Sequence, residues 1–205
     1  FNNLISDNIT SVLSKYKIHT IYVSSCAVYG EKNYQENYSE LSPLSPTSEY
    51  GRHKIYSEKL YNKRIDQKKL LILRPPLIYS IYDHKSYQPG KFVNDALKMG
   101  KIELWGEGME LREFINIFDA SFIIYTMAVQ KVNGLINLVS GKSFSYNSIA
   151  LEIQKHVGCK LVFKERDSEI VNHTYASKQL SNIIGEYKFL SPIQTVRLFF
   201  GKCLI

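Results

Sequence analysis

Hydrophobic positions along the chain follow two spacings, one typical of amphipathic helices and the other of buried strands. From Asn2 to Tyr16 the apolar residues recur every three or four positions, which predicts a helix. The next segment, His19–Ser25, is short and β-rich, as buried parallel strands are. A polar loop over Gly30–Pro46 leads to a predicted helix at Ser48–Gln67, and Lys69–Arg74 is a second predicted strand. This alternation of helix and strand predicts a parallel α/β sheet.

The second half of the chain carries shorter elements, with no internal repeat. In the first half, either Thr47 or Ser48 is expected to cap the N-terminus of the long predicted helix Ser48–Gln67. The later predicted strands are Ile102–Trp105, Phe114–Phe118, Leu135–Val139 and Lys160–Phe163, and the later predicted helices are Phe92–Lys98, Ala120–Val129, Tyr146–Val157, Ser177–Ile184 and Pro192–Phe199.

Composition narrows the class of protein. The chain has 205 residues, 44% hydrophobic and 22% charged, which is an ordinary globular balance for one domain, or one and a small second. It contains no apolar run of about 18 residues and no secretion signal, so no membrane partner is expected. Cys26, Cys159 and Cys203 are too few and too scattered for a disulfide framework or a metal site, so a cytoplasmic location is expected.

The net charge of +7 raises the question of an anionic partner. Lysines and arginines are spread along the whole chain, without a zinc-finger spacing, a recognition helix or an aromatic RNA-binding motif. A site for a small anionic ligand is therefore favoured and no nucleic-acid partner is expected, although the sequence pI of about 9.1 supports that alternative.

Candidate chemistry begins with Tyr50 and Lys54, which stand four positions apart on the predicted helix and therefore share a face. An ammonium group beside a phenol favours the phenolate and lowers the pKa of the tyrosine from about 10. Such a tyrosine can exchange a proton with a sugar or steroid hydroxyl near pH 7. The spacing alone is weak in a chain with 15 tyrosines, and an exposed helical pair is the alternative.

Residues at the ends of the two strands strengthen the first interpretation. The first strand ends in Ser24 and Ser25, and the next is followed by Pro75 and Pro76. Carboxyl ends of parallel strands meet at the edge where α/β proteins bind ligands. We therefore expect these residues, Tyr50 and Lys54 to converge on one crevice.

Four motifs in this order, SSCAVYG, PLSPTSEYGRHK, LRPPLIY and WGEGMELREFINIFDA, resemble the extended short-chain dehydrogenase/reductases. More narrowly, they resemble the NAD(P)-dependent sugar-nucleotide epimerase/dehydratase family, in the manner of UDP-glucose 4-epimerase. The resemblance implies an α/β fold: the C-terminal part of a Rossmann-type doubly wound parallel sheet plus a small α+β substrate-binding domain. Residues 1–80 and 114–141 would form the former, and residues 81–113 and 142–205 the latter.

The resemblance also implies residue roles. Ser25, Tyr50 and Lys54 would be catalytic, with Tyr50 as general acid/base. For Arg112 the alternative is a surface salt bridge to Glu110 or Glu113, and for Arg166 a structural role rather than a ligand contact is favoured. NAD or NADP would contact Ser24, Tyr50, Lys54, Pro75, Pro76 and Leu77, and a nucleotide-diphosphate sugar would contact Ser25, Tyr29, Arg112 and Arg166.

Departures from the family pattern limit the reaction. Dehydratases of the family carry an Asp-Glu pair where this chain has Cys26 and Ala27, so epimerase or 4-ketoreductase chemistry is expected instead. Cys26 is expected to pack rather than to act as a nucleophile. The resemblance further implies a homodimer through the Asn2–Tyr16 and Tyr50 helices, and a role in surface polysaccharide synthesis.

The chain contains no glycine-rich dinucleotide motif and begins with Phe1 rather than Met. By the resemblance, three βα units and a fourth strand, about 90–100 residues, would precede it. We expect the isolated chain to expose the edge of its first strand, to be poorly stable and to bind NAD(P) weakly or not at all. A truncated non-catalytic remnant, or a regulatory or binding protein, is the alternative function.

Overall fold

The computed structural model describes residues 2–30, 37–83 and 87–202, so Phe1 and Cys203 lie outside the described residues. The chain forms two compact units. The first contains Phe1–Pro76, Ala120–Val139 and Tyr175–Tyr187, and the second contains Leu77–Asp119, Ser140–Thr174 and Lys188–Ile205.

A three-stranded parallel sheet lies at the centre of the first unit. Its strands are β1 (Thr20–Val23), β2 (Leu70–Arg74) and β6 (Gly134–Asn137), in the order β1-β2-β6. All five residues of β2 are buried, as the unbroken apolar run that precedes Arg74 requires of a strand covered on both faces. Among the described residues β1 pairs with β2 alone, so its other edge carries no partner strand.

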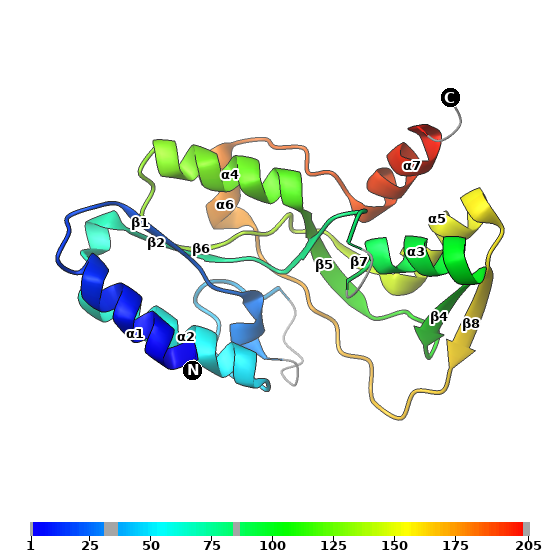
Figure 1. The fold of residues 1–205 in the computed structure, drawn as a ribbon, viewed down its shortest axis with the longest axis horizontal. Coiled ribbons are helices and arrows are strands. Elements are labelled where there is room, and N and C mark those ends of the chain that lie inside the picture. The colour runs from blue at the N-terminus through cyan, green and yellow to red at the C-terminus, as the bar shows by residue number, and fades with distance from the viewer. Residues whose placement is uncertain (1, 31–36, 84–86, 203–205) are drawn as a thin grey trace. The chain divides into compact units, whose positions relative to one another are not determined.

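Helices cover both faces of this sheet (Figure 1). On one face α1 (Asn2–Leu13) packs beside α2 (Glu49–Arg64), and on the other lie α4 (Ile117–Val129) and α6 (Lys178–Ile184). Two short 3-10 helices, η1 (Cys26–Tyr29) and η2 (Gln67–Lys69), follow β1 and precede β2. These layers give the Rossmann-type α/β arrangement that the sequence predicted.

The second unit has two small sheets. One has the order β3-β5-β7, with the first pair parallel and the second antiparallel, and the other pairs β4 with β8 in parallel. The strands are β3 (Leu77–Tyr79), β4 (Lys101–Trp105), β5 (Leu111–Asn116), β7 (Ser143–Ser145) and β8 (Lys160–Lys164), and the helices are α3 (Gly90–Met99), α5 (Tyr146–Val157) and α7 (Pro192–Lys202).

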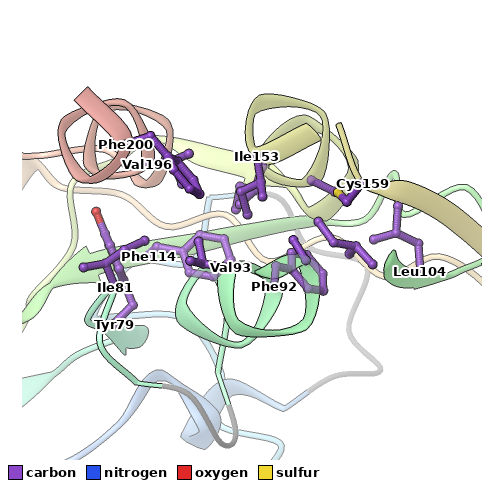
Figure 2. Close-up of a cluster of buried hydrophobic side chains, with 14 residues drawn as sticks. Tyr79, Ile81, Phe92, Val93, Leu104, Phe114, Ile153, Cys159, Val196 and Phe200 are labelled. Atoms are coloured by element: carbon purple, nitrogen blue, oxygen red, sulfur yellow. The ribbon is translucent and has the colours of Figure 1, made fainter. Parts of the chain in front are cut away.

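A hydrophobic core joins the three helices of the second unit to β5. Figure 2 shows Phe92 and Val93 of α3 pointing toward Ile153 of α5, with Val196 of α7 and Phe114 of β5 beside them. Each of these side chains is at most 4% exposed. Burial on this scale makes the hydrophobic effect the main force that holds this unit together.

Several predicted element boundaries are shifted in the structure: the first helix ends at Leu13 rather than Tyr16, and α2 ends at Arg64 rather than Gln67. The shift at the end of β5 has a clear local cause. The expected strand Phe114–Phe118 instead ends at Asn116, and Ile117 and Phe118 begin α4. The Asn116 Oδ1 atom accepts a hydrogen bond from the Phe118 backbone N–H at 2.9 Å, a side-chain contact that starts a helix. Hydrophobic character alone had placed both residues in a strand, but Phe118 is 73% exposed.

Ser48 rather than Thr47 caps α2, and its side chain accepts from the Gly51 N–H. By contact, residues 77–80, 114–119 and 140–141 group with the second unit, and residues 175–187 group with the first. The cofactor-binding and substrate-binding roles expected of the two domains stay predictions. No helix among the described residues has the length and apolar character that crossing a membrane requires.

Gly51 offers a test of how tightly α2 packs. A Cβ atom at this position would lie 2.6 Å from the Ala27 carbonyl oxygen and 2.8 Å from Pro46 Cβ. Gly51→Ala should therefore lower the free energy of unfolding by about 1–3 kcal/mol, as overpacking does. Helix propensity by itself would act in the opposite direction by about 1 kcal/mol.

Gly201→Ala is the matched control, because a Cβ there meets nothing within 4 Å. It should be neutral or raise stability by up to about 1 kcal/mol. Urea unfolding of both variants measures the difference. Equal effects of the two substitutions would show that α2 does not depend on its close approach to η1.

Candidate functional site

Ser25 lies at the carboxyl end of β1, where the chain enters η1. Its backbone is extended, and its Oγ atom accepts a hydrogen bond from the Ala27 N–H at 3.1 Å, so the side chain caps η1. Pro75, which follows β2, is held next to this turn because its carbonyl accepts from the Cys26 N–H at 2.8 Å. The two strand ends are therefore tied together at one edge of the sheet.

The first turns of α2 bring Tyr50 and Lys54 to the same edge. Gly51 packs directly on the Ala27 carbonyl, so α2 lies against η1. The Lys54 ammonium donates to the Val23 carbonyl at 2.9 Å and lies 5.4 Å from the centre of the Tyr50 ring. Tyr50 itself is 53% exposed. Tyr50 and Lys54 thus lie on one face of α2 as expected. The Tyr50 side chain is exposed to solvent, and the Lys54 ammonium is hydrogen-bonded to the end of β1.

Lys54 is partly buried, and this burial changes the pKa of its ammonium group. Loss of solvent lowers the pKa of Lys54, while the Glu58 carboxylate one turn along α2 acts in the opposite direction. The Tyr22 ring lies 5.2 Å from the ammonium, which adds a cation–π contact. The position of Lys54 therefore depends on the strand end and on its own helix.

Beneath these residues lies a buried ion pair that the sequence analysis missed. Glu58 accepts two hydrogen bonds from Arg74, at 3.0 Å from Nε and 2.7 Å from Nη2, and one from Ser24 Oγ at 2.5 Å. Arg74 also donates to the Tyr29 hydroxyl at 2.9 Å, which in turn donates to Asn137 at 2.7 Å. Two features of the sequence could have indicated this pair: Glu58 follows Lys54 by four positions on the same helix, and Arg74 ends a buried strand.

Two residues expected to touch ligands are used inside the protein. Tyr29 is 1% exposed, and burial raises its pKa to about 12. Ser24 is 2% exposed and donates its hydroxyl to Glu58. Their contacts with substrate and cofactor stay predictions. Cys26 is buried, with its thiol donating to the Arg74 carbonyl at 3.2 Å, so the structure uses it in packing.

The second unit holds Leu77, Arg112 and Arg166, while Pro76 is the last residue of the first segment of the first unit. Leu77 is half-buried in β3. Arg112 donates from Nη1 to the Leu111 carbonyl at 3.0 Å and to the Val171 carbonyl, and no carboxylate pairs with it among the described residues. Arg166 donates to Glu110 at 2.8 Å, a salt bridge in line with the structural role favoured for it.

The surface next to Arg166 is hollowed. Trp105 is 60% exposed there, with the Lys164 ammonium 5.5 Å from its ring centre. From the sequence, Trp105 was expected only to end a strand. The depression has a volume of about 340 Å³ and is lined by Trp105, Glu165, Arg166, Asp167 and Ser168.

Glu113, adjacent to Arg112, is a buried carboxyl group. It is 1% exposed, and burial raises its pKa to about 7 against the hydrogen bonds from the Gly141 N–H at 2.8 Å and the Ser140 hydroxyl at 3.1 Å. His173 titrates in the opposite sense, because burial first and Arg112 second lower its pKa to about 4. Both groups therefore tend toward their neutral forms in the folded protein.

A parallel sheet covered by helices on both faces, with a tyrosine–lysine pair at its carboxyl edge, defines a Rossmann-type α/β protein. The model of the NAD dependent epimerase/dehydratase family matches residues 2–139, more than half of the chain. The chain therefore belongs to the NAD dependent epimerase/dehydratase family.

Known proteins agree with this assignment. The chain is 27% identical over 154 residues to the ADP-L-glycero-D-manno-heptose-6-epimerase of Fusobacterium nucleatum. The matched region covers 65% of this chain and 46% of that protein. It thus spans about half the length of this curated relative.

Solved structures show the same fold. An NAD-dependent NDP-hexosamine 5,6-dehydratase of tunicamycin biosynthesis superposes with a TM-score of 0.82 at 21% identity, covering 99% of this chain and 69% of that one. The UDP-N-acetylglucosamine 4-epimerase of Methanobrevibacter ruminantium, solved with UDP-N-acetylmuramic acid, gives 0.78 at 23% identity, covering 96% and 68%.

Glu113 gives a pH-dependent test of this description. Its pKa in the folded protein, about 7, lies above the ordinary value of 4.5, so its contribution to stability is full below about pH 4.5 and is lost as the pH rises through 7. Glu113→Gln cannot ionise. From pH 4.5 to 8 the free energy of unfolding of the variant should therefore rise relative to wild type by about 3 kcal/mol.

Urea unfolding at several pH values provides the measurement. His173 titrates in both proteins, so its effect cancels in the comparison. Glu107→Gln is the control, since Glu107 is an exposed carboxylate of the same unit. A difference between wild type and Glu113→Gln that does not vary with pH would contradict the buried, neutral carboxyl group.

Proposed function

We propose that the protein carrying this chain is an NAD(P)-dependent nucleotide-sugar epimerase or 4-ketoreductase with Tyr50 as the acid/base. Family membership and the geometry around Lys54 support it. The observation that carries the proposal is the exposed Tyr50 hydroxyl-bearing ring beside the Lys54 ammonium at the carboxyl edge of a parallel sheet.

The residues at this edge fit a nicotinamide cofactor. Among the described contacts, the Lys54 ammonium uses one hydrogen bond, to Val23, and an ammonium has three N–H donors. Two donors therefore remain for the ribose hydroxyls of a dinucleotide. When bound there, such a cofactor would supply the hydride-transfer chemistry that epimerisation or ketone reduction needs. Ser25 is half-buried at the carboxyl end of β1, where its hydroxyl can contact the reacting sugar oxygen.

Tyr50 moves the proton in this proposal. Oxidation of a sugar hydroxyl releases one proton along with the hydride, and the exposed Tyr50 oxygen can accept it and later return it. Cys26 and Ala27 stand after the predicted catalytic serine and offer no acid and base for elimination of water. Epimerisation or ketone reduction needs only the hydride and this proton.

Two arginines of the second unit are proposed to hold the substrate diphosphate. Arg112 is half-buried and faces no carboxylate among the described residues, so its guanidinium can pair with phosphate. Arg166 is committed to Glu110 through Nη2, while its buried Nη1 atom has no partner. Arg112 is therefore the stronger candidate. We further propose a homodimeric assembly and a role in polysaccharide synthesis, as the family resemblance implies.

Tyr50→Phe tests the acid/base role in the whole protein. It should lower kcat by about 10²–10⁴-fold, because only the proton-transferring hydroxyl is removed, and leave cofactor affinity nearly unchanged. Lys54→Met should weaken both kcat and cofactor affinity. Turnover of nucleotide sugars and fluorescence titration with NADH and NADPH measure the two effects.

Tyr125→Phe is the matched control, because Tyr125 is 68% exposed on α4 and far along the chain from the site residues. It should leave both quantities at the wild-type level. Retention of most activity by Tyr50→Phe would exclude Tyr50 as the acid/base. Wild-type protein without turnover on any nucleotide sugar would favour a non-catalytic member of the family.

A further inference from the structure

A buried charge pair lies one helical turn behind Lys54. Glu58 of α2 is 5% exposed, and Arg74 at the end of β2 is 3% exposed. Their side chains form a two-pronged ion pair. Burial works to lower the pKa of Arg74, but the Glu58 carboxylate and the Tyr29 hydroxyl hold it above its usual value. Arg74 therefore stays charged inside the first unit.

Stability alone is a poor reason for such a pair. Removing two charges from water is costly, and apolar residues of similar volume often serve the interior as well or better. Polar groups in a low-dielectric interior do impose strict geometry, because each must keep its partners. The informative question is therefore which parts of the protein this geometry connects.

The connections all lead to the candidate site. The Glu58 carboxylate receives hydrogen bonds from Ser24, at the end of β1, and from Arg74, at the end of β2. The free arm of Arg74 donates to Tyr29 of η1, the 3-10 helix capped by Ser25. Two strand ends, η1 and α2 thus meet at one ion pair.

We propose that Glu58 and Arg74 are positioning residues that fix α2 along the sheet edge and so place Lys54 and Tyr50 for the reaction. Lys54 is four positions before Glu58 and Tyr50 is eight before it, so all three follow one face of α2 over about 12 Å. A shift of Glu58 along its helix axis moves both residues with it. This inference rests on the proposed function for its catalytic consequence.

Arg74→Lys separates positioning from charge balance. Lysine keeps the positive charge, but it cannot donate to Glu58 with two prongs and reach Tyr29 at the same time. We expect kcat to fall about 100-fold, as for a misplacement of about 1 Å, with KM for the nucleotide sugar within about twofold of wild type. If Arg74 only neutralised the charge of Glu58, Arg74→Lys would keep the wild-type kcat. That result would overturn the proposal.

Arg64→Lys is the matched control on the same helix. Arg64 ends α2 and pairs with Asp7 of α1 at 2.8 Å, far from the strand ends. It should leave kcat and KM unchanged. An equal fall in kcat for both variants would show a general sensitivity of α2 and overturn the specific role of Arg74.

If Arg74→Lys does not fold, Ser24→Ala tests the same proposal. It removes one hydrogen bond to Glu58 and leaves the ion pair in place. We expect a smaller loss of kcat at nearly unchanged melting temperature. An unchanged kcat in this folded variant would count against the proposal.

Competitive acetylation provides a readout that does not need activity. The Lys54 ammonium is protected by its bond to Val23 and by partial burial. Its labelling by acetic anhydride, relative to exposed Lys59, should rise in Arg74→Lys and stay at the wild-type level in Arg64→Lys. Unchanged labelling in folded Arg74→Lys overturns the positioning role. Absence of turnover in wild type would instead count against the proposed function alone.

Discussion

The buried ion pair between the Glu58 carboxylate and Arg74 is the interaction on which the arrangement of the first unit depends. The carboxylate lies where β1 and β2 end, and it accepts three hydrogen bonds there, one from Ser24 and two from Arg74. A steric constraint acts on the same helix two turns earlier, where Gly51 lies so close to the Ala27 carbonyl that no side chain fits. Because α2 is held at both points, its first two turns have a defined position over the strand ends.

This arrangement gives two neighbouring residues opposite environments. Lys54 is partly buried and held by the Val23 carbonyl, whereas the Tyr50 ring is more than half exposed. A group that exchanges a proton with a substrate must be reachable, and the cation beside it acts most strongly when solvent does not screen it. The contrast in burial between the two residues therefore fits the roles proposed for them, Tyr50 as the acid/base and Lys54 as the cation beside it.

Sequence patterns predicted most of the elements because their apolar residues have helical or strand spacing. The long helix containing Tyr50 and the buried strand before Pro75 are clear examples. The strand ending at Asn116 was misjudged, since a side-chain cap rather than hydrophobicity starts the next helix. The ion pair of Glu58 was missed because pairing depends on the distance between two elements, which spacing along one chain does not reveal. The tyrosine–lysine pair was found because both residues lie on one helix.

Unpartnered buried polar atoms are distributed unevenly between the two units. Among the described residues, the first unit has one, on Thr20, and the second has five, on Glu110, Glu113, Asn147, Arg166 and His173. A buried polar atom without a partner is costly, so such atoms persist where another group supplies the partner. In the first unit the polar network is closed on itself and fixes geometry. In the second, Arg166 still has an N–H to offer, and its bond to Glu110 keeps that side chain ordered. This difference is consistent with the proposed roles of the two units, the first in positioning reacting groups and the second in receiving a charged, hydrogen-bonding ligand.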